Sequence, residues 1–111
     1  QYVLYPGLEN HPGYVINKAQ TTGFGGMISF AVDNAETARQ ILEGIKLIKF
    51  AESLGGTESL ITYPIRQTHT DLTAEECAEN GITDCLLRFS TGIEATQDLI
   101  DDFAQAFAAI E

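Results

Sequence analysis

The stretch Cys85–Phe107, CLLRFSTGIEATQDLIDDFAQAF, decides the fold class, because its pattern changes from that of a strand to that of a helix. Residues 85–90 form a short, mainly apolar run, which predicts a strand whose side chains alternate between two faces. Over 94–110, apolar residues recur at helical spacing. We expect this helix to bury one apolar stripe against a sheet: Leu99, Ile100, Phe103, Phe107 and Ile110.

The same change of pattern occurs earlier in the chain. Met27–Val32 predicts a strand, because alternate apolar residues fall on one face, namely Ile28, Phe30 and Val32. Asp33 and Glu36 have the spacing of a capping box, which marks the start of a helix. We expect that helix over 35–46, where the apolar stripe consists of Ala38, Ile41, Leu42 and Ile45.

The remaining segments predict short elements joined by turns. We expect a turn-rich loop over 4–13, a short helix over Tyr14–Ala19, a strand over Thr57–Tyr63 that Pro64 ends, and a short helix bounded by a Thr73/Glu76 capping box and Gly81. The chain, residues 1–111, is therefore predicted to be a single domain of the α/β class (an α+β type two-layer sandwich). A small, mainly antiparallel sheet would carry helices on one face.

Composition excludes several classes of function. Sixteen acidic residues against six basic ones give a formal net charge of −10, which repels the phosphates of nucleic acid. No apolar run is long enough to cross a membrane, no signal peptide opens the chain, and two cysteines make no disulfide framework, so we expect a cytosolic protein. His11 and His69 are too few for a metal site. Because the chain starts at Gln1, we expect a processed chain or part of a longer one.

Arg88 stands out, because it interrupts an otherwise apolar strand. Alternation places it on the face of Leu86 and Ser90, opposite Leu87 and Phe89. Its planar guanidinium fits a carboxylate through two hydrogen bonds. The alternative is an arginine on the solvated face of a half-covered sheet, and the spacing alone favours that alternative.

Four blocks, in one order, cover nearly the whole chain: Tyr5-Pro6-Gly7-Leu8 with His11-Pro12, GFGGM at 23–27, SLGGTESL at 53–60, and LLRFSTGIE at 86–94 followed by Asp98-Leu99-Ile100. Together they resemble the Cys/Met-metabolism pyridoxal-phosphate (PLP) enzymes. The resemblance implies the small C-terminal domain of a fold-type I PLP enzyme, with the cofactor and its lysine on a large domain before Gln1. Lys18, Lys46 and Lys49 lack the family's Ser-x-x-Lys setting, so no catalytic, cofactor-binding or metal-binding residue is assigned here.

The resemblance also implies a substrate-binding set. In this family the arginine of the LRxSxGIE block binds the α-carboxylate of an amino-acid substrate, and that arginine is Arg88 here. Ser53 and Thr68 correspond to residues that line the same pocket, although both also suit turn positions that bond to loop amides. Glu52 precedes the SLGG block, where a carboxylate would suit the distal ammonium of cystathionine or the amino group of cysteine. A solvated loop glutamate is the alternative.

These residues predict cystathionine γ-synthase chemistry, in which cysteine and an O-acyl-homoserine give cystathionine and PLP acts as the electron sink. A cystathionine β- or γ-lyase is the alternative, followed by methionine γ-lyase or O-acetylhomoserine sulfhydrylase, whose substrates present no such cation to Glu52. The resemblance further implies a homo-oligomer, a tetramer, for the full-length enzyme. The element pattern alone also suits a stand-alone module that binds a small molecule, an amino acid.

Overall fold

A five-stranded sheet organises the domain. The computed structural model describes residues 1–67 and 71–110. The strands lie in the order β1-β2-β5-β4-β3, and all neighbours are antiparallel except β3 and β4. Their bounds are Tyr2–Leu4 (β1), Met27–Ala31 (β2), Lys49–Phe50 (β3), Leu60–Thr62 (β4) and Leu86–Ser90 (β5). The mainly antiparallel sheet and the mixed α/β class are confirmed.

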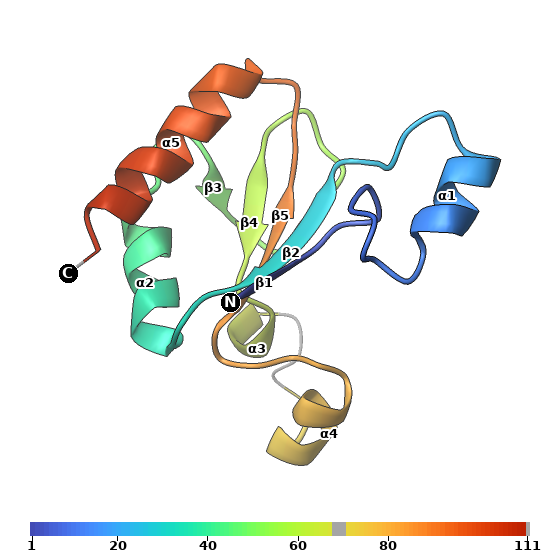
Figure 1. Cartoon of the computed structure of the whole chain (residues 1–111). Coiled ribbons are helices and arrows are strands. Elements are labelled where there is room, and N and C mark those ends of the chain that lie inside the picture. Colours follow the sequence, from blue (N-terminus) through green and yellow to red (C-terminus); the bar gives the residue numbers. More distant parts are fainter. Residues whose placement is uncertain (68–70, 111) are drawn as a thin grey trace.

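Two helices, α2 (Ala35–Gly44) and α5 (Thr96–Ala108), lie side by side and cover one face of the sheet (Figure 1). The other three are short: α1 (Tyr14–Gln20), α3 (Pro64–Gln67) and α4 (Ala74–Glu79). In Figure 1, α1 stands on the opposite side of the sheet from α5, at the end of a long loop. None of the described helices is long and apolar enough to cross a membrane.

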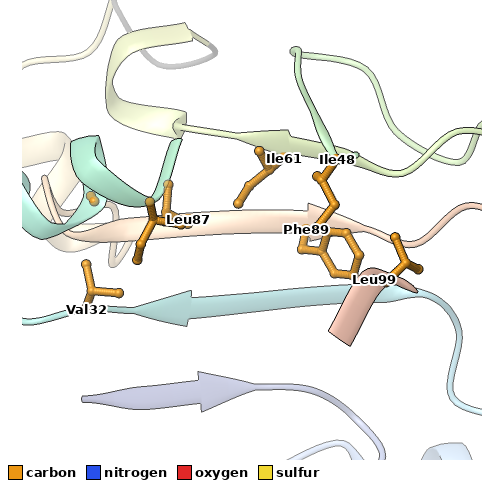
Figure 2. Packing of buried hydrophobic residues seen from close by; sticks show 8 residues of the cluster. Val32, Ile48, Ile61, Leu87, Phe89 and Leu99 are labelled. Atoms are coloured by element: carbon orange, nitrogen blue, oxygen red, sulfur yellow. The ribbon is translucent and has the colours of Figure 1, made fainter. Parts of the chain in front are cut away.

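The hydrophobic core lies between the sheet and the α2–α5 pair (Figure 2). Leu87 and Phe89 point into it from the central strand β5, and the Phe103 ring of α5 meets Phe89 edge-on with centroids 5.1 Å apart. Burying one such side chain contributes roughly 1.5–3 kcal/mol. The other buried members come from both layers: Val32, Ala38, Ile41, Ile48, Ile61 and Leu99.

The predicted apolar stripe of α5 is only partly buried. Leu99 is buried, and Phe103 and Ile110 pack against the core, but Ile100 and Phe107 are 53% and 45% exposed. These two side chains instead line an open, mainly apolar groove of about 650 Å³ beside β1 and β2. The stripe prediction was wrong at both positions because the sheet on that side ends in β1, which is three residues long.

The helix α2 begins at Ala35 as predicted, but its N-cap and its end differ from the prediction. Asn34, not Asp33, is the N-cap, since its Oδ1 accepts a hydrogen bond from the Thr37 N–H at 2.8 Å. Glu36 instead bonds to Arg39 on the exposed helix surface. The helix ends at Gly44 rather than at residue 46, because the chain becomes extended at Ile45. The next three residues are hydrogen-bonded to α5.

Asp102 of α5 holds that segment. Its carboxylate accepts hydrogen bonds from the backbone N–H groups of Lys46, Leu47 and Ile48, at 2.8, 2.9 and 2.9 Å. Burial alone would raise the pKa of Asp102, but the bonds from these three N–H groups and from Gln105 outweigh it and lower the pKa. An acidic residue of α5 therefore holds the segment that follows α2 by accepting from its backbone N–H groups.

Other boundaries follow the predictions to different degrees. The Thr73/Glu76 capping box is confirmed, and Gly81 follows α4 with a φ of +71°. The predicted strand over 57–63 shortens to β4, after which Pro64 begins α3. β1 was missed, because its three residues lie at the start of a stretch dominated by turn formers.

Candidate functional site

Arg88 lies at the middle of the central strand. In register it stands between Ser29 of β2 and Thr62 of β4. Because side chains alternate along a strand, Arg88 points away from the core helices, on the face that also carries Leu86 and Ser90. Leu86 and Ser90 are both buried, and Arg88 itself is half-buried. This side of β5, which we call the site face, is therefore not an open, solvated surface.

The loop that covers the site face is residues 51–56. The N–H of Gly55 donates to Ser90 Oγ at 2.8 Å, and Arg88 Nη2 donates to the carbonyl oxygen of Glu52 at 3.0 Å. Gly55 has a φ of +71°, a backbone conformation that favours glycine. The SLGG block is thus folded back over β5, which brings Glu52 and Ser53 to the region of the arginine. Glu52 and Arg88 are 36 residues apart in the sequence.

Among the described residues, the guanidinium of Arg88 has neutral hydrogen-bond partners only. Nη2 also donates to Thr62 Oγ1 at 3.2 Å, and Nε is buried with no acceptor among the described residues. Within residues 1–67 and 71–110, no carboxylate lies at salt-bridge distance from it, and the ion pairs there involve Arg39. A half-buried cation without a counter-ion is costly, and its unused donors suit an anion from outside the domain.

The other predicted site residues are placed less completely. The side chains of Glu52 and Ser53 are exposed, and neither makes a hydrogen bond to a described residue; only the backbone of Glu52 touches Arg88. Thr68 lies outside the described residues. The structure therefore brings Arg88, Glu52 and Ser53 to one region, while the substrate-binding roles of Arg88, Glu52, Ser53 and Thr68 stay predictions.

A second hydrogen-bond network, which sequence reasoning missed, joins Ser59, just after the 51–56 loop, to the segment 92–94 that follows β5. Glu94 accepts two hydrogen bonds from Ser59, from its N–H and from its hydroxyl, both at 2.7 Å. The Ser59 oxygen in turn accepts from the N–H of Gly92 at 2.8 Å. The Ser59 N–H, and then its hydroxyl, lower the pKa of Glu94. A Cβ on Gly92 would lie 2.5 Å from the Thr57 carbonyl oxygen, so the two segments meet too closely for a side chain there.

No described lysine suits covalent attachment of PLP. Lys18, Lys46 and Lys49 are all exposed. Lys49 shares the side of the sheet that carries Ser90, but it lies on the edge strand β3, two strands from β5. Lys18 rests over the Tyr14 ring on α1, and Lys49 Nζ donates to the carbonyl of Lys46. A lysine that forms a Schiff base is normally activated by burial or by a neighbouring cation. Likewise, no three metal-ligating side chains converge within the part of the chain that the structure describes.

Residues 1–108 match the family described as Cys/Met metabolism PLP-dependent enzyme. The chain belongs to this family. The resemblance of the four sequence blocks is thereby confirmed, and so is the expected small-domain fold of a fold-type I PLP enzyme. The members of this family use PLP, and the lysines described above give no place for its attachment on this chain.

The relatives carry several different activities. The chain is 48% identical over 110 residues to cystathionine gamma-lyase of Bacillus subtilis (strain 168), covering 99% of this chain and 29% of the relative. It is 47% identical to L-methionine gamma-lyase of Fusobacterium nucleatum subsp. nucleatum, over 97% of this chain and 28% of the relative. The crystal structure of cystathionine gamma synthase from Xanthomonas oryzae pv. oryzae in complex with cystathionine matches with a TM-score of 0.91 and 43% identity, over 97% and 28% of the two chains. The chain thus spans less than a third of these relatives.

Proposed function

We propose that this chain is the C-terminal, substrate-binding domain of a PLP-dependent trans-sulfuration enzyme, and that Arg88 binds the α-carboxylate of its amino-acid substrate. The unpaired guanidinium carries the proposal. In a chain with sixteen acidic residues, the arginine at the centre of the sheet is held by a hydroxyl and a backbone carbonyl and by no described carboxylate. An arrangement of this kind keeps the positive charge available for a ligand.

The chain would contribute orientation rather than bond chemistry. Neutral acceptors hold Nη2, which restricts the rotation of the guanidinium plane, and Nη1 remains for the carboxylate, since Nε is buried. A carboxylate fixed at one end of an amino acid limits which of the bonds at its Cα faces a reactive group supplied by the rest of the enzyme. The loop over the site face would shield this ion pair from water and so strengthen it.

Within the family, we favour cystathionine γ-synthase activity, in which the cysteine sulfur replaces the acyloxy group at Cγ of an O-acyl-homoserine and that group leaves as a carboxylate. The proposal rests on Glu52. Its backbone carbonyl accepts a hydrogen bond from Arg88, and its side-chain carboxylate is exposed and could meet the amino group of cysteine or cystathionine. Cystathionine γ-lyase is the second candidate, because the Bacillus subtilis relative of that name is 48% identical. The 47% identity to a methionine γ-lyase shows that similarity alone separates none of these reactions.

The full-length protein should be assayed with three substrate sets: cystathionine, O-acyl-homoserine plus cysteine, and methionine. We expect formation of cystathionine to have the highest kcat/KM. A higher value for cystathionine cleavage would identify a lyase, and a higher value for methionine would refute the role given to Glu52. No turnover of any set by the PLP-loaded protein would contradict the enzymatic proposal itself and favour an amino-acid binding module.

A further inference from the structure

Thr62 is a buried hydroxyl in a strand that otherwise carries apolar side chains. It is 1% exposed and follows Leu60 and Ile61 in β4. Burying a hydroxyl costs free energy unless its hydrogen bonds are made inside the protein. Valine would occupy nearly the same volume without that cost, so the hydroxyl calls for an explanation in terms of what it bonds.

The direction of its hydrogen bonds follows from its partners. Thr62 Oγ1 lies 2.7 Å from the carbonyl oxygen of Ala51, which can only accept, so the hydroxyl proton points to Ala51. The lone pairs of Oγ1 therefore face Arg88 Nη2, 3.2 Å away. Thr62 is thus fixed as an acceptor for the arginine by a backbone group on the covering loop.

The same nitrogen meets a second acceptor. The carbonyl oxygen of Glu52, the next residue along that loop, accepts from Nη2 at 3.0 Å. With both N–H bonds of Nη2 directed to these oxygens, the guanidinium plane has one preferred orientation, and Nη1 remains for a ligand because Nε is buried. On the other side of Arg88, Ser29 occupies the matching position in β2, yet its hydroxyl makes no hydrogen bond to a described residue.

We propose that Thr62 is a positioning residue for the substrate carboxylate: its hydroxyl links the Ala51 carbonyl to Arg88 and aims the guanidinium. This inference rests on the proposed role of Arg88. In this inference β4 and the 51–56 loop orient the arginine, whereas β2 on its other side does not. The hydroxyl acts through Arg88 and does not itself touch the substrate.

The test uses the PLP-loaded full-length enzyme and two small probes. Butyrate has a carboxylate but no amine or sulfur to react, and butyramide is its neutral counterpart of almost the same shape. Dissociation constants come from calorimetry and from competitive inhibition. We expect Thr62→Val to weaken butyrate binding about tenfold, the order expected for one hydrogen bond to a charged group, with little change for butyramide. For the substrate, KM should rise more than kcat falls.

Three further variants make the result specific. Thr62→Ser keeps the hydroxyl and should restore butyrate binding. Ser29→Ala removes the hydroxyl on the other side of Arg88 and should leave both probes unchanged. In an Arg88→Lys background, Thr62→Val should cost little more, since the group that it orients is gone. If Thr62→Val does not fold, Thr62→Cys replaces the hydroxyl by a weak acceptor and keeps a weak donor for the Ala51 carbonyl.

The outcomes separate the two proposals. Normal butyrate binding by Arg88→Lys would overturn the carboxylate role of Arg88 and this inference with it. Weak binding by Arg88→Lys together with normal binding by Thr62→Val would overturn only the role of Thr62. Equal losses for butyrate and butyramide, or no rescue by Thr62→Ser, would show that Thr62 serves packing alone.

Discussion

The five residues of β5 alternate between its two faces, and the two faces differ in chemistry. Leu87 and Phe89 lie in an apolar core beneath α2 and α5, whereas Arg88 lies on the site face beside Thr62 and under the 51–56 loop. Both faces are covered, one by helices and the other by a loop. Shifting the register of the strand by one residue would therefore exchange the core for the site. The following predictions test whether stability belongs to one face and ligand binding to the other.

The largest effect is expected on the core face. Leu87→Ala leaves a cavity at a side chain that is fully buried, so it should lower the free energy of unfolding by about 2–5 kcal/mol. Chemical denaturation of the full-length protein measures this. The KM of the folded fraction should stay close to that of the wild type. A large rise in KM without loss of stability would contradict the division between the two faces.

On the site face, Arg88→Lys should show the reverse pattern. The change replaces the planar guanidinium by the point charge of an ammonium. We therefore expect kcat/KM to fall by the equivalent of about 2–4 kcal/mol of transition-state stabilisation, mainly because KM rises. The denaturation midpoint should shift little, because the guanidinium has no ion pair with a described residue to lose. Near-normal kcat/KM would make Arg88 a structural arginine.

Asp102→Ala probes how the core face is held together. The substitution leaves the N–H groups of Lys46, Leu47 and Ile48 without their acceptor, and we expect about 1–3 kcal/mol of lost stability. Thermal unfolding checks the value. Asp102→Asn keeps one acceptor oxygen and serves as the matched control, with a smaller loss expected. Equal stability of both variants and the wild type would show that water replaces the carboxylate.

Glu52→Ala tests selectivity at the loop over the site face. If the carboxylate meets a distal ammonium, kcat/KM for cystathionine, or for cysteine as acceptor, should fall by about 1–3 kcal/mol. Activity with methionine should fall far less, because methionine presents no such cation. The ratio of the two activities is the measurement, since a disturbed loop would lower both together. Equal losses would return Glu52 to the status of a solvated residue.

The smallest effect concerns pH and Glu94. The bonds from Ser59 lower the pKa of this carboxyl below its ordinary value in the folded state. The stabilisation is therefore present above the ordinary pKa and is lost as the pH falls through the folded pKa. Wild type should therefore lose more thermal stability between pH 7 and acid than Glu94→Gln does. Melting curves from neutral to acidic pH measure the difference. Parallel curves would mean that the bonds to Ser59 contribute no pH dependence.

Local patterns determined much of this protein. The alternation in Met27–Val32 and Cys85–Ser90, the Thr73/Glu76 capping box and the placement of Arg88 opposite Leu87 could all be predicted, because each depends on residues within one element. The four sequence blocks determined the family, which the match over residues 1–108 confirms. They also named Arg88, Glu52 and Ser53, which the fold brings to one region.

Only the tertiary structure decided what these residues contact. The partners of Asp102 lie 54–56 residues away, those of Arg88 26 and 36, and those of Glu94 35. No sequence period encodes such separations. The hydrogen bonds that Asp102 accepts from residues 46–48, the contacts of Thr62 and Ser59, and the lack of a described carboxylate beside Arg88 could therefore not be predicted. The exposure of Ile100 and Phe107 belongs here as well. A helical pattern defines an apolar stripe, but the width of the sheet opposite decides how much of it is buried.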